Sequence, residues 1–99
     1  MQDAPFNNLS PAEAERLAML AEEAAEVIQV VGKVLRHGYS SHHPDDPNET
    51  PNQRLLEQEI LDFRAVCEMM VAQWDILPPS DRAIESRTAQ KKIYTHHQG

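Results

Sequence analysis

Apolar residues recur every three or four positions between residues 11 and 37, which is the spacing of one face of an α-helix. The stripe consists of Leu17, Leu20, Ala24, Val27, Ile28, Val31, Val34 and Leu35. Ser10, Pro11 and Glu13 form a start signal: a capping serine, a proline at the first helical position and a glutamate that closes the capping box. Because Gly38 is a typical C-terminal stop, the pattern predicts a helix over about 11–37.

Two further helices are predicted by the same signals. The stretch "GYSSHHPDDPNETPN" is dominated by turn-forming residues and indicates a loop over 38–50. Thr50 then serves as the N-cap of a helix over about 51–76, with Gln53 closing its capping box. The segment "LPPSDR" breaks this helix, and Ser80 caps a third helix over about 80–94.

The predicted fold class is therefore all-α, because no segment shows the alternation of a strand. Two long helices joined by a loop form a helical hairpin, which cannot enclose a core alone, and the third helix is short and polar. We expect a single domain over residues 1–99 that pairs with a copy of itself into a four-helix bundle. The expected assembly is a homodimer or homotetramer.

Composition narrows the function. The 99-residue chain carries 16 acidic against 9 basic residues, a net charge of -7, which argues against a general nucleic-acid binder. A nucleotide ligand remains compatible, because bound divalent cations invert the local charge. No apolar run is long enough to span a bilayer or resembles a secretory signal, so we expect no membrane partner. Cys67 is the single cysteine, which favours a reduced, cytoplasmic setting.

Four acidic residues lie at positions where a hairpin should be apolar. Glu23 and Glu26 share a sector of the first helix with apolar residues, between its stripe and the solvent side. On the second helix, Leu55, Phe63, Val66 and Met70 all fall within about 40° of Glu59 on a helical wheel. Asp62 lies about 60° from Glu59 on the same wheel. Acids on an apolar face need an explanation.

Two explanations compete. Glu-rich strings on helices are commonly solvated faces, and Glu59 and Asp62 could reach solvent or pair with Arg54 or Arg64. Burying an unpaired carboxylate costs several kcal/mol, however, so such groups are normally paired or bound to metal. An acidic pair on each of two facing helices makes a cage of oxygen ligands. Such a cage, free of histidine, suits Mg²⁺ or Mn²⁺.

Other metal sites are less favoured by the pattern. A ferritin-like di-iron centre needs Glu-x-x-His on its helices, and this pair does not occur in the sequence. A structural zinc site in "SHHPDD" is conceivable, although solvated loop histidines explain this segment more simply.

The acidic motifs resemble those of a known family. "EEAAE" (22–26) followed by "EILD" (59–62) resembles the EExxE…ExxD signature of the all-α nucleoside triphosphate pyrophosphohydrolases, the MazG-like superfamily. The tail "SRTAQKKIYTHHQ" is similar to the basic C-terminal segment of short phage-type and bacterial members. The resemblance covers residues 10–98. The chain departs from the family at Ala25 and Leu61, where glycine is frequent, and keeps every acid of the signature.

The resemblance implies hydrolysis of a (d)NTP to the monophosphate and pyrophosphate, with Mg²⁺ or Mn²⁺ as cofactor. Some phage relatives of this kind act on dGTP or GTP, although nothing in this chain reads guanine. By motif position the metal ligands are Glu23, Glu26, Glu59 and Asp62. Glu22, one turn from Glu26, is assigned to orienting or deprotonating the attacking water.

Substrate binding requires cations near the acids. The candidates for the phosphates are Lys33, Arg36, Lys91 and Lys92, each of which is otherwise a solvated cation, and Asn52 is a candidate for a base edge. The runner-up function is a non-enzymatic helical interaction or adaptor dimer, which would fold and act without Mg²⁺. A third hypothesis, a bundle that only stores or senses a divalent metal, predicts metal binding without affinity for triphosphates.

Overall fold

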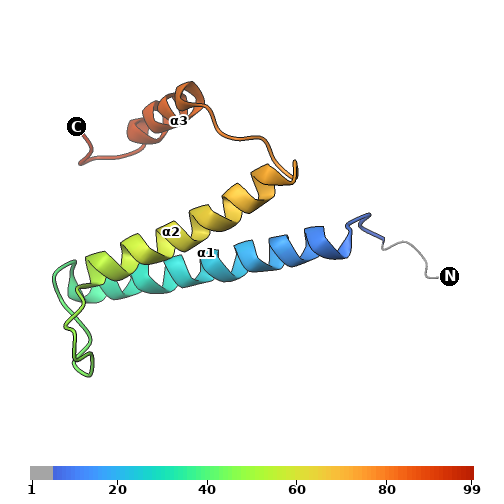
Figure 1. Ribbon diagram of the computed structural model, residues 1–99. Helices are drawn as coiled ribbons and strands as arrows, with labels where there is room; N and C mark the ends of the chain where they lie inside the picture. The colour runs from blue at the N-terminus through green and yellow to red at the C-terminus, as the bar shows by residue number, and fades with distance from the viewer. Residues whose placement is uncertain (1–5) are drawn as a thin grey trace.

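The structure, a computed structural model, describes residues 6–99, and these residues form three α-helices and no strand. The helices are α1 (Pro11–His37), α2 (Asn52–Ala72) and α3 (Asp81–Ile93). α1 and α2 lie side by side and antiparallel as a long hairpin, and after the end of α2 the chain turns back, so that α3 stands apart above α2 (Figure 1). The predicted all-α class is confirmed for the described part of the chain.

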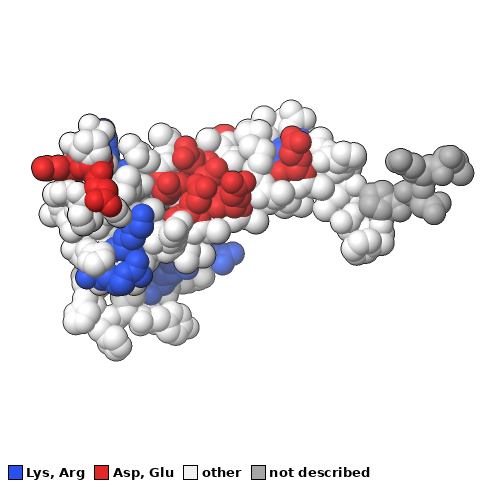
Figure 2. Space-filling model, turned by 90° about the horizontal axis from the view of Figure 1, so that it is seen from below, with Lys and Arg blue, Asp and Glu red and all other residues white. Residues whose placement is uncertain are grey.

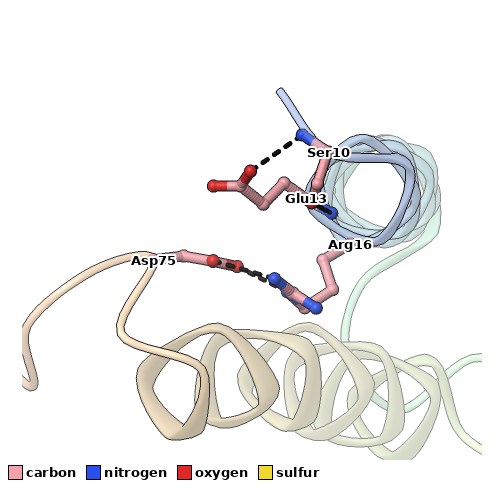
Figure 3. Close-up of polar contacts among 4 residues, drawn as sticks. All are labelled: Ser10, Glu13, Arg16 and Asp75. Atoms are coloured by element: carbon pink, nitrogen blue, oxygen red, sulfur yellow. Dashed lines mark hydrogen bonds and ion pairs between the residues drawn. The ribbon is translucent and has the colours of Figure 1, made fainter. Parts of the chain in front are cut away.

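α1 has the predicted bounds and the predicted termini. The Ser10 hydroxyl accepts a hydrogen bond from the Glu13 N–H at 3.1 Å, and the Glu13 carboxylate accepts one from the Ser10 N–H at 2.8 Å (Figure 3). This reciprocal capping box satisfies two amides that the first turn of a helix leaves free. At the other end, Gly38 has a φ of 85° and donates its N–H to the Val34 carbonyl at 2.7 Å.

α2 begins at Asn52, within one residue of the predicted start, but its predicted N-cap is wrong. Pro51, not Thr50, is the N-cap, and no side chain caps the helix. The Thr50 N–H instead donates to the Asp46 carboxylate at 2.9 Å. The first amides of α2 are satisfied by the loop backbone: Asn52 donates its N–H to the Ser41 carbonyl at 2.8 Å, and the next N–H reaches the Tyr39 carbonyl at 2.9 Å. The loop therefore replaces the side-chain cap.

α2 ends at Ala72, four residues before the predicted end. Trp74 adopts a left-handed φ of 60°, and the Asp75 N–H donates back to the Met70 carbonyl at 2.9 Å, which is the bond pattern of a Schellman motif. A non-glycine residue in the left-handed region costs about 1–2 kcal/mol. The turn places the Asp75 carboxylate against α1, where it pairs with Arg16. α3 begins and ends within one residue of the predicted bounds.

An ion pair closes the open end of the hairpin. The Arg16 guanidinium donates two hydrogen bonds to the Asp75 carboxylate, at 2.5 and 2.9 Å (Figure 3). The two side chains are only 14% and 11% exposed, so water screens the pair weakly. The hydrogen bond from Arg16, together with its positive charge, holds the pKa of Asp75 below its usual value. Sequence reasoning missed this contact between residues that lie 59 positions apart.

The hairpin buries little of its apolar surface. Val30, Val66 and Met70 are the buried hydrophobic residues of the described chain, and Asn52 is its buried polar residue. Much of the predicted α1 stripe remains open, with Ile28 71% and Leu35 82% exposed. The contact face of α1 is rotated from the centre of the stripe toward Glu23. Within residues 6–99 no helix combines the length and apolar character that crossing a bilayer requires.

We expect Asp75→Asn to lower the free energy of unfolding near neutral pH, because the amide leaves the Arg16 guanidinium without its counter-charge. A carboxylate whose pKa is lowered by folding stabilises the folded protein at pH values above its ordinary pKa of about 3.8. This contribution is lost as the pH falls through the lower pKa of the folded protein. The free energy of unfolding of the parent minus that of the variant, measured by urea unfolding, should therefore be constant near neutral pH and shrink below about pH 4.

Glu57→Gln is the matched control for this change. It removes an ion pair to Arg54 whose side chains are 56% and 66% exposed, and exposed pairs contribute little to stability. An Asp75→Asn effect no larger than that of the control would show that the closing ion pair does not stabilise the hairpin.

Candidate metal centre and adjoining pocket

Three carboxylates from the two helices of the hairpin come together at its middle. Glu23 and Glu26 on α1 and Glu59 on α2 each offer one oxygen, and these oxygens lie within 4.8 Å of one another. Glu23 and Glu26 share a face because residues three apart on a helix are neighbours. Glu59 joins them because α2 packs antiparallel to α1 at this level. The structure thus brings together three of the four predicted ligands.

Two of these carboxylates each have an oxygen that is buried without a partner. Oε2 of Glu23 and Oε2 of Glu59 are shielded from solvent, and neither accepts a hydrogen bond from any residue in the range 6–99. Buried polar atoms in proteins are nearly always hydrogen-bonded, and an orphaned one costs free energy. The two oxygens therefore call for a positively charged or hydrogen-bonding ligand.

The same geometry raises the pKa of both groups. For Glu23 the largest cause is burial, followed by the nearby carboxyl group of Glu26 and the negative charges of Glu26, Asp62 and Glu59. For Glu59 the causes are burial, then Glu26 and Asp62, opposed by the positive charge of Lys33. When all of these carboxylates are ionised, their negative charges repel one another. The site holds on to protons unless a cation replaces them.

Asp62 and Glu22 lie at the margin of the cluster. Asp62 is exposed and is not one of the three carboxylates whose oxygens converge, although its charge reaches both Glu23 and Glu59. Glu22 is exposed as well, one turn before Glu26 on α1. Figure 2 shows the acidic side chains gathered over the middle of the hairpin, with basic side chains toward the loop end. The centre is therefore open to solvent on one side.

The donor set fits a hard divalent cation. Carboxylate oxygens are the preferred ligands of Mg²⁺ and Mn²⁺, and the described residues contain no other group of three or more potential ligands. Ligand oxygens lie about 2.0–2.1 Å from Mg²⁺, so two oxygens on one ion are about 3–4 Å apart. The three oxygens lie within 4.8 Å of one another, which is compatible in scale with ligands of one ion. The histidines of "SHHPDD" do not form such a group with Asp45 or Asp46.

A pocket of about 310 Å³ lies between the loop and the adjoining turns of α1 and α2. This volume is at the small end of the range for small-molecule sites, about 300–1,000 Å³. Its lining combines two cations, three imidazoles, two small polar side chains and two apolar ones: Lys33, Arg36, His37, Ser41, His42, His43, Pro44, Asn52 and Leu55. The pocket is suited to a ligand that carries negative charge.

Three of the predicted substrate-binding residues meet in this pocket, namely Lys33, Arg36 and Asn52. Asn52 is 4% exposed and donates its side-chain N–H to the Gly38 carbonyl at 3.2 Å, so it also ties the loop to α2. Lys33 connects the pocket with the acids, because its charge acts on Glu59. Along α1, Lys33 lies seven residues beyond Glu26, a rise of about 10 Å.

The histidines of the pocket are the residues that sequence reasoning missed. His37 lies one helical turn after Lys33, which is a signal the sequence contains. His42 and His43 come from the loop, and their placement depends on how the loop folds back. Asp46 holds that fold: its carboxylate accepts N–H bonds from Asn48 and Thr50, both at 2.9 Å, which lower its pKa.

Lys91 and Lys92 lie far from this arrangement. Both are exposed on α3, which makes no close contact with α1 or α2 in the described part of the chain. The predicted phosphate ligands thus divide into two groups, with Lys33 and Arg36 in the pocket of the hairpin and Lys91 and Lys92 on a separate helix.

Comparisons of the chain with protein-family models, with curated proteins and with solved structures give no match.

We expect Glu59→Gln to raise the melting temperature of the metal-free protein near neutral pH, because the amide removes a desolvated charge from the cluster. A raised pKa means that folding stability is lost as the pH rises from the ordinary glutamate value of about 4.5 through the folded value. The gain of the variant over the parent should grow over this window and then level off. Thermal unfolding in chelator at a series of pH values measures it.

Glu68→Gln is the control, because Glu68 is an exposed glutamate of α2 outside the cluster. Surface changes of this kind alter stability by no more than about 0.5 kcal/mol. If Glu59→Gln destabilises the metal-free protein, the Glu59 carboxylate has a stabilising partner, and its Oε2 does not require a cation.

Proposed function

We propose that this protein is a metal-dependent nucleoside triphosphate pyrophosphohydrolase that cleaves a (d)NTP to the (d)NMP and pyrophosphate. The observation that carries the proposal is the pair of buried, unpartnered oxygens of Glu23 and Glu59 in a cluster with Glu26. A divalent cation satisfies these oxygens and offsets the repulsion among the carboxylates. The resemblance of "EEAAE" and "EILD" to the MazG-like signature supports the same reaction.

In the proposed reaction Glu23, Glu26 and Glu59 would hold Mg²⁺ or Mn²⁺, with Asp62 at the margin as a further candidate ligand. A cation held there would supply charge neutralisation of the phosphates and polarisation of a water for attack on the α-phosphorus. The water oxygen bonds to that phosphorus as the bond to the bridging oxygen breaks, and pyrophosphate leaves. Glu22, exposed beside the cluster, accepts the proton that the water loses. The protein thus supplies positioning and charge, as in other phosphoryl transfers.

The pocket beside the loop is proposed to take the rest of the substrate. Lys33 faces both the pocket and Glu59, so it is suited to a phosphate oxygen between them. Arg36 and the three imidazoles add positive charge and hydrogen-bond donors for the phosphates or the sugar. Leu55 and Pro44 offer apolar contact to a base. Asn52 already donates to Gly38, so only its remaining donor and its oxygen are free for a base edge.

Self-association is part of the proposal, as a homodimer or homotetramer built on a four-helix bundle. The exposed apolar side chains of α1, including Leu17, Ile28, Val31 and Leu35, lie at helical spacing along one side. On α2, Ile60 is 43% exposed, and Phe63 and Cys67 continue a similar stripe. Apolar surface of this kind is normally buried against another element.

The same apolar surface favours a second candidate, a non-enzymatic interaction or adaptor dimer. Such a module would have no use for orphaned carboxylates between its helices. The two candidates differ in their response to divalent cations, because only the enzyme requires the acidic centre to bind one.

We expect the purified protein to convert at least one of the eight common NTPs and dNTPs to its monophosphate and pyrophosphate with Mg²⁺ or Mn²⁺, and not in EDTA. Product separation distinguishes this reaction from loss of a single phosphate. Replacing a group that holds a metal ligand in place typically lowers metal affinity or activity about 10–100-fold. Glu59→Gln removes a proposed ligand itself, so it should lower kcat/KM by at least about 100-fold. Glu68→Gln should retain the parent's rate.

Failure of all eight nucleotides, with Glu59→Gln folding as well as the parent, would leave the adaptor dimer as the better proposal. Binding of Mn²⁺ without binding of any triphosphate would instead favour metal storage or sensing.

We expect Ile28→Glu to shift the protein to a monomer, because it places a charge in the proposed interface. In the isolated chain Ile28 is already 71% exposed, so the change does not disturb the hairpin itself. Sedimentation equilibrium measures the effect, and Gln29→Glu adds the same charge at the next, exposed position as a control. A monomeric parent at micromolar concentration, or an unchanged variant, would contradict the proposed interface.

A further inference from the structure

α3 is a helix that lacks a packing partner within the described chain. It spans 13 residues, has no buried residue and makes no close contact with the hairpin. Isolated helices of this length are marginal in water, because nucleation is costly and tertiary packing supplies most helical stability. Ile84 is 51% and Ile93 is 75% exposed. α3 therefore needs a surface to pack against.

One face of α3 combines apolar and cationic side chains. Ile84, Arg87, Thr88 and Lys91 recur at helical spacing, and with Pro79 and Ala83 they line a shallow hollow of about 400 Å³. The acidic residues of α3, Asp81 and Glu85, do not line it. The helix carries four basic and two acidic residues in a chain whose net charge is -7. Its partner surface is thus expected to be acidic.

The acidic centre of the hairpin has the complementary character, since it holds carboxylates and few cations. Among the described residues, Lys33 is the cation whose charge acts on Glu59. With a metal ion and a triphosphate bound, the phosphates would carry the excess negative charge and would require additional positively charged ligands. Arg87 and Lys91 are one turn apart and can contact the same polyphosphate.

We propose that α3 acts in trans: it packs over the acidic centre of a second copy of the chain and supplies Arg87 and Lys91 to the phosphates bound there. This inference rests on the proposed function for the identity of the phosphates. The packing of α3 onto the acids of the second copy does not depend on any nucleotide.

The arrangement within one chain favours the second copy over the chain's own centre. In Figure 1, α3 lies above α2, whereas Figure 2, seen from below, shows the acidic cluster on that lower side. Asp75 is fixed to Arg16, so only residues 76–80 remain to redirect α3. Pro78 and Pro79 restrict the backbone of this linker further. α3 is thereby held away from its own acids while its cationic face stays open.

The decisive experiment combines two variants that are each inactive for a different reason. We call α3 the arm and the cluster of Glu23, Glu26 and Glu59 the centre. Glu59→Gln disables the centre and leaves the arm intact. Arg87→Ala with Lys91→Ala removes the cations of the arm and leaves the centre intact. The two chains are co-expressed with different affinity tags, and the mixed oligomer is isolated by sequential purification. We expect the arm variant alone to lose about 10–100-fold in kcat/KM, as for the loss of charge-assisted hydrogen bonds.

In the mixed dimer, an arm that acts in trans completes one centre of the two, because the arm of the Glu59→Gln chain reaches the intact centre of the other chain. The rate should recover to about half that of the parent, as two-fold symmetry requires. An arm that acts within its own chain completes no centre, and an inactive mixed dimer would overturn the inference. Full activity of the arm variant alone would overturn it as well. Arg82→Ala, which removes an arginine of α3 outside the hollow, is the control and should keep the parent's rate.

A nucleotide-free experiment separates this inference from the proposed function. Equal amounts of ¹⁵N-labelled and unlabelled protein are co-refolded and treated with a carbodiimide, which couples a lysine amine to a carboxylate in contact with it. We expect Lys91 to be coupled to an acid of the centre, such as Glu26 or Asp62, in peptides that contain one labelled and one unlabelled half. If cross-linked peptides contain only labelled or only unlabelled halves, or if Lys91 is not coupled, the proposal that α3 acts in trans is overturned even if the enzyme is active. Mixed-isotope coupling in a protein that hydrolyses no nucleotide would retain the arm and remove the proposed function.

Discussion

The rest of the structure depends on one electrostatic constraint, the presence of desolvated carboxylates between the two helices of the hairpin. Oε2 of Glu23 and Oε2 of Glu59 occupy interface positions that apolar side chains would otherwise fill, and neither has a partner among residues 6–99. This placement weakens the contact between α1 and α2 in the metal-free state. It also raises the pKa of both groups, and the proposed cation would both satisfy the acids and strengthen the hairpin.

The two ends of the hairpin compensate for its weak middle. At the open end, Arg16 and Asp75 form a two-bond ion pair across the helices. At the loop end, backbone bonds from the first amides of α2 to the loop and the bond from Asn52 to Gly38 hold the turn in place. With both ends fixed, the acids and the pocket beside them keep a constant separation along α1. A ligand that spans the two would meet a preformed arrangement, which limits the ordering that binding requires.

The small core and the free α3 have a common physical origin. Two helices can shield only the surface between them, and part of that surface here is occupied by acids. The apolar side chains that remain outward on α1, and the uncovered face of α3, therefore require surfaces that a single chain does not supply. The proposed assembly of copies would provide such surfaces and would bring the cationic helix of one chain toward the acidic centre of another. Stability and the completed site would then arise together.

The sequence by itself determined the local features of this protein. Helical periodicity, the capping box of Ser10 and Glu13 and the stop at Gly38 depend on near neighbours, and the structure has them as predicted. The i, i+3 spacing likewise predicted that Glu23 and Glu26 would share a face. Tertiary structure decided the remainder: the loop contacts that replace Thr50 as the cap of α2, the Arg16–Asp75 pair, the loop histidines of the pocket and the margin position of Asp62. These features join residues far apart in the chain, and their geometry depends on the rotation of one helix against the other, which periodicity alone leaves free.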